Sequence, residues 1–351
     1  MKKMLYMCAV EWKWIAQRPQ FLEMELEKDY EITVLSPVHA FKKIKTQKNT
    51  TLPERFKEFS LLPYQEKVGA ISGLSKALFK GKVKNFDEYD IVWLGSALFG
   101  KYIPEDYKGI VVFDYMDDCI SMQSNPKMKE AYSSQQAKLV ERADLICASS
   151  QYLIGLLPES TREKTILIRN AFRGKDIIPP AEIKPENIVK IGYVGTIAEW
   201  MDWKLLEKCR EVLGNVVFHF WGPENSRPDN EEGFVFHGVV EHSAIPNEIK
   251  DMHALMMPFV VNDIVKAVDP VKLYEYISYG KNIISVQYDE VKRFGEYVWL
   301  YKDEETFIEL VKGIGEGKIH CKYDSASQSE FLKENTWSHR AEEVKKGIDS
   351  L

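Results

Sequence analysis

Residues 269–286 read DPVKLYEYISYGKNIISV, a pattern typical of a helix followed directly by a buried strand. Pro270 suits the first position of a helix and Asp269 suits its N-cap, so the helix is expected to begin there. The first backbone amides would then be free at a positive helix end, where an anion such as a diphosphate binds well. These amides belong to Val271, Lys272 and Leu273. The alternative is a capped amphipathic helix whose lysine and glutamate are surface charges.

The rest of the chain repeats this alternation of helix and strand. Short segments that are apolar on both faces alternate with helical stretches, which predicts parallel strands buried in doubly wound α/β sheets. The segments lie at 4–10, 31–37, 90–96, 109–116, 143–150 and 165–171, and again at 189–196, 215–222, 233–240, 253–259 and 282–286. Between the two sets, 173–187 carries three prolines and no periodicity, which indicates a linker. Ligands of such sheets bind beyond the carboxyl ends of the strands, so a cleft between two domains is the expected site.

Length and composition narrow the function classes. A chain of 351 residues with 45% hydrophobic and 28% charged residues suits two globular domains rather than a disordered segment. Its five cysteines are odd in number and lack zinc-site spacing, which favours reduced thiols in a cytoplasmic protein. No apolar run is long enough to predict a transmembrane helix. The net charge of −6 argues against nucleic acid as a partner.

The segment 42–84 departs from this acidic balance, with eleven basic and three acidic residues. Aromatic and long aliphatic side chains are interspersed among the lysines, and such mixtures bind membrane surfaces rich in anionic lipid. The alternative is a solvated surface of helices and loops. We therefore hypothesise peripheral contact between 42–84 and the inner face of the plasma membrane.

Three acidic residues stand at the end of the strongly apolar segment 109–116 and just after it, and these are Asp114, Asp117 and Asp118. Crowding of like charges would raise the pKa of one carboxyl toward the range useful for a general base. We expect Asp117 to be this base. The alternative is that one carboxylate caps the next segment while the others are solvated.

Four segments carry a resemblance to a known family. They are WIAQRPQ at 14–20, IGYVGT at 191–196, FHG at 236–238 and DPVKLYEY at 269–276. In this order they resemble GT-B-fold glycosyltransferases, and among those the enzymes of teichuronic acid and capsular polysaccharide synthesis. An oxidoreductase is disfavoured, because no GxGxxG motif follows a predicted strand.

The resemblance implies two Rossmann-like domains facing a cleft. Residues 1–172 would bind the acceptor, 173–187 would link the domains, and 188–335 would bind the nucleotide sugar. The last helix, 336–351, would cross back and pack on the first domain.

The resemblance also implies roles for single residues in the second domain. Lys272 and the helix amides would bind the donor diphosphate, and Glu275 would bind the ribose diol. Gly195 and Thr196 would form a turn close to the phosphates. His237 and Gly238 would bind the nucleobase. The alternatives are an ordinary strand-to-helix turn and a structural histidine at a strand end.

In the first domain, Trp12 and Trp14 are candidates for stacking on sugar rings, although either could belong to the core. Arg18 is a candidate for contact with a phosphate. Ala267 stands where many retaining enzymes of this fold carry glutamate, which favours an inverting mechanism. No metal and no cofactor are expected.

The function expected from this resemblance is a hexosyltransferase. It would transfer sugar from a nucleotide-sugar donor, UDP-sugar by preference, to a polysaccharide or lipid-linked saccharide in cell-surface polysaccharide synthesis. The alternatives are a UDP-sugar 2-epimerase of the same fold and a non-catalytic partner in polysaccharide assembly.

Overall fold

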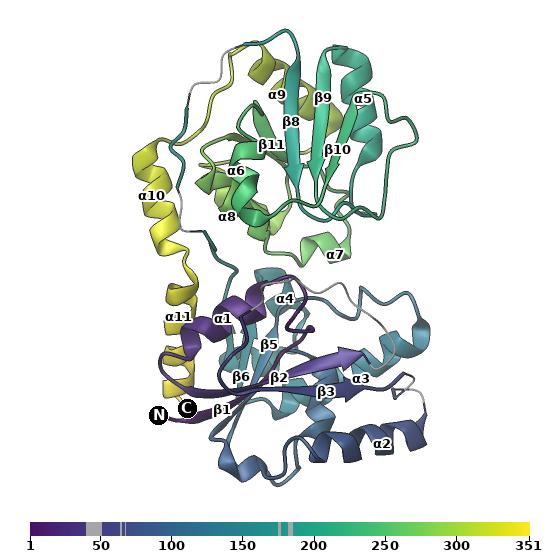
Figure 1. The fold of residues 1–351 in the computed structure, drawn as a ribbon, viewed down its shortest axis with the longest axis vertical. Coiled ribbons are helices and arrows are strands. Elements are labelled where there is room, and N and C mark those ends of the chain that lie inside the picture. Colours follow the sequence, from purple (N-terminus) through teal and green to yellow (C-terminus); the bar gives the residue numbers. More distant parts are fainter. Residues whose placement is uncertain (40–50, 64, 67, 175–176, 182–184) are drawn as a thin grey trace. The chain divides into compact units, whose positions relative to one another are not determined.

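A computed structural model describes residues 1–39, 51–63, 65–66, 68–174, 177–181 and 185–351. The chain divides into two compact units, each built on its own parallel sheet (Figure 1). The first unit comprises Met1–Asn170 and Trp337–Leu351, and the second comprises Ala171–Thr336. The predicted pair of doubly wound α/β domains is therefore confirmed. The described part of the predicted linker 173–187 forms no helix or strand, while 175–176 and 182–184 lie outside the described residues.

The first unit contains a seven-stranded sheet in the order β3-β2-β1-β4-β5-β6-β7, in which all neighbouring strands run parallel. Its strands are β1 Lys3–Met7, β2 Glu31–His39, β3 Phe56–Leu61, β4 Ile91–Leu94, β5 Ile110–Tyr115, β6 Leu145–Ala148 and β7 Thr165–Leu167. Its helices are α1 Arg18–Leu26, α2 Gly69–Lys80, α3 Pro126–Arg142, α4 Gln151–Leu156 and α11 Trp337–Asp349, with 3₁₀ turns η1 Phe86–Glu88, η2 Ala97–Tyr102 and η3 Glu159–Lys164. Strand β4 is buried at every position, as expected for a parallel strand covered on both faces.

The second unit contains a six-stranded parallel sheet in the order β10-β9-β8-β11-β12-β13. Its strands are β8 Val189–Val194, β9 Val216–Trp221, β10 Phe234–Gly238, β11 Ala254–Met257, β12 Asn282–Val286 and β13 Trp299–Tyr301. Its helices are α5 Trp203–Leu213, α6 Ile245–Glu248, α7 Asp263–Lys266, α8 Val271–Ser278, α9 Glu304–Gly315 and α10 Ser325–Glu334, with 3₁₀ turns η4 His242–Ala244 and η5 Asp289–Phe294. In both units the sheet order reverses beside the first strand, which is where such sheets bind ligands.

The C-terminal helix α11 belongs to the first unit, where it packs against α1 (Figure 1). The rings of Phe21 and Trp337 lie 5.7 Å apart, and Lys345 pairs with Asp29. The prediction that the last helix returns to the first domain is confirmed.

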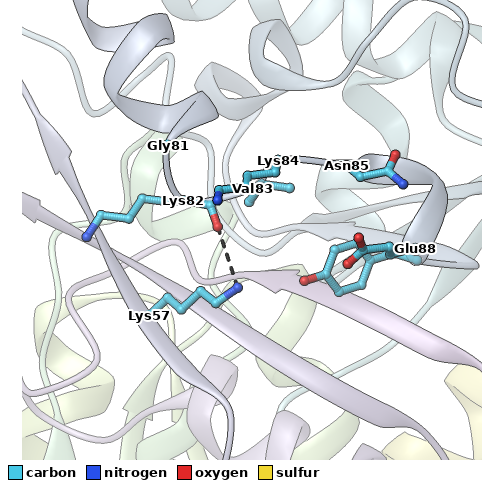
Figure 2. A pocket seen from close by; sticks show the side chains of 8 residues that line it. Lys57, Gly81, Lys82, Val83, Lys84, Asn85 and Glu88 are labelled. Carbon is cyan, nitrogen blue, oxygen red and sulfur yellow. Dashed lines mark hydrogen bonds between the residues drawn. The ribbon is translucent and has the colours of Figure 1, made fainter.

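The basic segment predicted at 42–84 is only partly described, because 40–50, 64 and 67 lie outside the described residues. A cavity of about 350 Å³ lies beside the N-terminal end of β3 and the turn after α2, lined by Lys57, Lys82 and Lys84 together with Glu88 (Figure 2). Lys57 Nζ donates to the carbonyl oxygen of Lys82. Within the described ranges, no helix is long and apolar enough to cross a bilayer.

Candidate functional site

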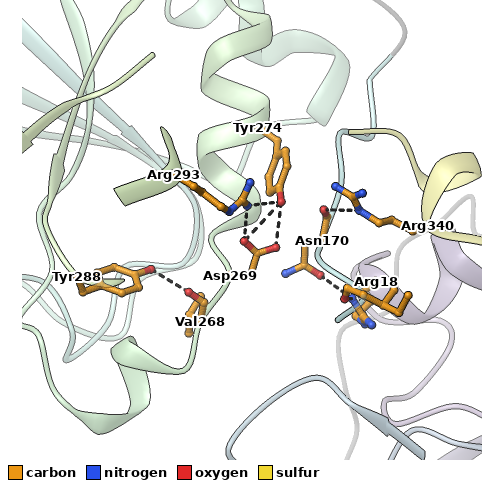
Figure 3. A network of polar contacts seen from close by, with 9 residues as sticks. Arg18, Asn170, Val268, Asp269, Tyr274, Tyr288, Arg293 and Arg340 are labelled. Carbon is orange, nitrogen blue, oxygen red and sulfur yellow. Dashed lines mark hydrogen bonds and ion pairs between the residues drawn. The ribbon is translucent and has the colours of Figure 1, made fainter. Parts of the chain in front are cut away.

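Each unit carries a cluster of the predicted site residues at the carboxyl edge of its own sheet. In the second unit this cluster is built around the N-terminus of α8. Asp269, predicted to be the N-cap, instead accepts a hydrogen bond from the Tyr274 hydroxyl at 3.1 Å and pairs with Arg293 at 2.6 Å (Figure 3). The N-cap is Pro270, which has no capping side chain. The N-cap prediction is therefore wrong, because the buried Asp269 carboxylate is used to compensate the guanidinium of Arg293.

Without a side-chain cap, the first amides of α8 keep their hydrogen-bonding capacity. Among the described residues, the amides of Val271 and Lys272 have no hydrogen-bond partner. The amide of Leu273 donates to the carbonyl of Pro270 at 3.1 Å, and its side chain is fully buried. The expectation of a free Leu273 amide is thus corrected, and the helix end offers two amides rather than three to an anion.

The side chain of Lys272 lies directly against the backbone of Gly195, in the turn after β8. A Cβ atom at residue 195 would stand 2.2 Å from Lys272 Cε, and the φ of Gly195 is +144°. The positive φ requires glycine here, and the close contact shows that the end of the Lys272 side chain lies on this backbone. The ammonium lies 5.7 Å from the centre of the Tyr193 ring, and the Tyr193 hydroxyl donates to the carbonyl of Thr196 at 2.8 Å. Lys272, which is far along the chain from Gly195 and Thr196, therefore lies at the same place in the fold as these two residues.

A second glycine at this edge was not found from the sequence. Gly222 follows β9, has a φ of +144°, and would place a Cβ 2.0 Å from the carbonyl oxygen of Gly195. Its amide donates to the carbonyl of Gly238 at 2.8 Å, while the amide of Gly195 donates to the carbonyl of Trp221. The turns after β8, β9 and β10 are therefore locked together through their backbones.

The His237 side chain stacks on side chains of the neighbouring strand β9. Its ring lies 4.4 Å from that of Trp221 at an interplanar angle of 7°, and its Nε2 lies 2.9 Å from His219 Nδ1. Burial lowers the pKa of both histidines, and that of His219 falls to about 4 with a further contribution from His237. Two neutral, stacked imidazoles indicate that the His237 side chain has a structural role.

Glu275, one turn into α8, is 18% exposed at its side chain, and its Oε1 lies 3.1 Å from His242 Nε2. His242 begins the turn η4 after β10 and was not singled out in the sequence. The α8 end thus brings together a cation, two amides and an oriented carboxylate.

In the first unit, Arg18 and Asp114 form a buried ion pair. Arg18 Nη2 and Nε lie 2.9 and 3.1 Å from Asp114 Oδ1, and Arg18 Nη1 donates to the carbonyl of Ile168 at 2.7 Å. Burial opposes the charge of Arg18, but the Asp114 carboxylate raises the pKa of the guanidinium above its ordinary value. Asn170 Oδ1 accepts a hydrogen bond from Arg18, and the Asn170 carbonyl accepts one from Arg340 (Figure 3). Arg18 and Asp114 are about 5% and 1% exposed, so this geometry does not support direct contact of Arg18 with a phosphate or of Asp114 with an acceptor.

We expect Arg18→Ala to lower the free energy of unfolding by about 3 kcal/mol, because it leaves the Asp114 carboxylate buried without its partner. Urea denaturation followed by tryptophan fluorescence measures this. The control is Arg162→Ala, which removes an exposed guanidinium paired with Glu159 in the same unit. Equal stability of the two variants would show that the buried pair is not needed for folding.

The other two acids differ in their surroundings. Asp118 is buried and its Oδ1 accepts the amide of Ser121 at 3.1 Å, so it caps the turn after β5. Asp117 is partly exposed and lines a small cavity together with Ser96 and Cys119. Burial raises the pKa of Asp117 from 3.8 to about 6; Arg18 lowers it, while Asp114 and Asp118 raise it. Of the three acids, Asp117 is the one that is partly exposed, and its raised pKa suits a base.

The two tryptophans differ in their exposure to solvent. Trp12 is 3% exposed and its indole donates to the carbonyl of Thr51, so it is part of the core. Trp14 is 38% exposed. The expectation that Trp12 contacts a sugar is corrected, and Trp14 stays a candidate for stacking on a sugar ring. Among the described residues, no group of three or more histidine, cysteine, aspartate or glutamate side chains could hold a metal ion.

The chain resembles several solved structures over its whole length. One is a lipopolysaccharide outer core galactosyltransferase WaaB, with a TM-score of 0.68 and 15% identity over 99% of each chain. Another is HepE of Anabaena in complex with UDP and glucose, with a TM-score of 0.68 and 14% identity over 100% of each chain. An E. coli trehalose-6-phosphate structure bound with UDP-2-fluoro glucose has a TM-score of 0.65 and 8% identity over 99% of each chain. These likenesses show the GT-B fold.

Among curated proteins, the putative teichuronic acid biosynthesis glycosyltransferase TuaH of Bacillus subtilis is 22% identical over 201 residues. The match covers 52% of this chain and about half the length of that relative. No protein-family model matches the chain. The resemblance to teichuronic acid glycosyltransferases inferred from the sequence is thereby confirmed.

Proposed function

We propose that this protein is a glycosyltransferase that moves a sugar from a UDP-sugar to a saccharide or lipid-linked acceptor in cell-surface polysaccharide synthesis. The observation that carries the proposal is the contact of the Lys272 side chain with the Gly195 backbone at the open N-terminus of α8. A cation, two free amides and a glycine in the adjoining turn suit a diphosphate. The name of the Bacillus relative supports the polysaccharide acceptor.

In the proposed donor site, Lys272 and the amides of Val271 and Lys272 bind the diphosphate and stabilise its charge as it leaves the sugar. Glu275 accepts hydrogen bonds from the ribose diol. The nucleobase lies against the backbone near Gly238. The bound UDP of HepE and the UDP-2-fluoro glucose of the trehalose-6-phosphate structure support uridine as the base, since both proteins share this fold.

We propose that Asp117 takes the proton from the acceptor hydroxyl as that hydroxyl attacks the sugar, in a single displacement that inverts the anomeric centre. Its raised pKa and its partial exposure support this role. We also propose that the reaction needs no metal, because Lys272 and the helix end already supply positive charge to the diphosphate.

A nucleotide-binding screen tests the proposal. Thermal unfolding of the purified protein is followed with UDP, GDP, dTDP, CMP and NAD⁺, each with Mg²⁺ or with EDTA. Stabilisation by UDP that persists in EDTA is expected. Stabilisation by NAD⁺ alone, or by no nucleotide, would overturn the donor site. Consumption of a UDP-sugar without any acceptor, giving its 2-epimer, would replace the transferase by an epimerase.

We further propose that the first unit binds an anionic membrane surface through helix α2. Leu74 and Leu78 lie one turn apart and are 55% and 46% exposed, whereas Phe79 is buried against the unit. Lys76 and Lys80 are exposed on the same helix. An apolar ridge among lysines suits a bilayer that carries negative head groups.

Replacing Leu74 and Leu78 together by serine should lower flotation with phosphatidylglycerol-containing vesicles by about tenfold, because each leucine buries apolar surface in the bilayer. Leu156→Ser, which changes an exposed leucine of the same unit, serves as the control. Wild-type flotation by the double variant, or none by the wild type at low salt, would refute membrane contact through α2.

A further inference from the structure

Glu275 does not stand alone at the proposed donor site. Its Oε1 lies 3.1 Å from His242 Nε2. Since a carboxylate only accepts hydrogen bonds, Nε2 of His242 is the donor. Among the described residues, Glu275 Oε2 has no protein partner, so one oxygen is held and the other is left for a ligand.

Both ends of this contact are anchored in the core. On either side of Glu275, the buried Tyr274 bonds to Asp269, and the Tyr276 hydroxyl contacts both the amide and the carbonyl of Val194 at 2.8 and 3.2 Å. On the other side, η4 leads into α6, where Ile245 is buried and Glu248 accepts a hydrogen bond from the Trp221 indole, and the buried Ile249 follows the helix. His242 therefore reaches Glu275 from a fixed position rather than from a free loop.

We propose that His242 is a positioning residue that orients the Glu275 carboxylate toward the ribose diol of the donor, so that the site discriminates ribonucleotides from 2′-deoxyribonucleotides. The inference rests on the proposed function. A glutamate side chain has three rotatable bonds, and holding one oxygen removes most of the freedom that ligand binding would otherwise have to restrict. Ordering such a side chain is worth about 0.5–1.5 kcal/mol, which corresponds to a two- to tenfold change in affinity.

The test compares two probes, UDP and 2′-deoxy-UDP, by isothermal titration calorimetry. We expect His242→Ala to weaken the binding of UDP by about two- to tenfold and that of 2′-deoxy-UDP by less, because 2′-deoxy-UDP lacks the 2′-hydroxyl that would donate a hydrogen bond to the carboxylate. A general loss of structure would weaken both probes equally. His242→Gln, whose amide can also donate to Glu275, should restore much of the discrimination.

A double-mutant comparison identifies the partner. In a Glu275→Ala background, His242→Ala should have no further effect on the ratio of the two dissociation constants. His339→Ala, which removes another histidine paired with a glutamate, on α11 of the first unit, is the control and should leave the ratio unchanged.

The outcomes separate the inference from the function on which it rests. Failure of the wild type to bind UDP would overturn the donor site and the role of His242 with it. Binding of UDP with the same preference over 2′-deoxy-UDP in His242→Ala as in the wild type would overturn the role of His242 alone.

Discussion

Lys272→Ala is expected to weaken UDP binding by roughly a hundredfold and to lower the rate of sugar transfer by roughly a thousandfold. The Lys272 ammonium lies beside Gly195, and Lys272 is the second residue of α8. The ammonium contributes to binding by attracting the negatively charged diphosphate. It contributes more in the transition state, where negative charge builds up on the leaving group. Calorimetry with UDP measures the first effect, and release of UDP from the UDP-sugar measures the second.

The control for this variant is Lys318→Ala, which removes an exposed ammonium of the same unit paired with Glu316. Both variants change the net charge equally, so a long-range effect of charge would appear in both. An unchanged dissociation constant for UDP in Lys272→Ala would contradict the assignment of the diphosphate to α8.

Asp117→Asn is expected to lower kcat by about a thousandfold, since an amide cannot take the proton from the acceptor hydroxyl. The pH dependence of kcat/KM should reflect the ionisation of Asp117. With a pKa of about 6, Asp117 is ionised at neutral pH, so kcat/KM should fall as pH drops below about 6. In the variant this acidic limb should be absent from the residual activity.

Asp117→Asn should raise the stability of the folded protein at neutral pH, although it lowers activity. Because burial raises the pKa of Asp117 in the folded state above its ordinary 3.8, the folded protein holds this proton more tightly than the unfolded chain. Stability from this group is therefore present below about pH 4 and is lost as pH rises toward 6. Asp117→Asn should thus raise the melting temperature at pH 7.5 relative to the wild type, but not at pH 4.

Asp118→Asn is the matched control, because Asp118 accepts the Ser121 amide through Oδ1 and an asparagine keeps that acceptor. It should retain most of the activity. If Asp118→Asn lost as much activity as Asp117→Asn, the choice of Asp117 as base would be wrong. The anomeric configuration of the product, read by NMR, tests the proposed inversion independently.

The fold was largely predictable, because buried parallel strands are apolar on both faces and recur with helices between them. Two strands were not predicted, β3 and β13, and both lie at sheet edges. Strand β3 has the sequence FKEFSL, in which charged and apolar residues alternate, and β13 has only three residues. An edge strand has one neighbour and less burial, so the pattern that identifies central strands is weak there.

The site could be predicted only where its residues are close together in the sequence. The sequence around Lys272 predicted a helix followed directly by a buried strand, and α8 and β12 form there. The partners of Arg18 and Asp269 could not be read in the same way, since Asp114 is 96 residues from Arg18 and Arg293 is 24 residues from Asp269. Gly222 and His242 lacked a signal of their own, because their roles come from contacts with Gly195 and Glu275 across the sheet edge.

A crystal structure of the protein with UDP, grown in EDTA, is the decisive test of the donor site. We expect the diphosphate within hydrogen-bonding distance of Lys272 Nζ and the amides of Val271 and Lys272, with the ribose at Glu275. UDP bound elsewhere on the protein, or no UDP density at a saturating concentration, would contradict it.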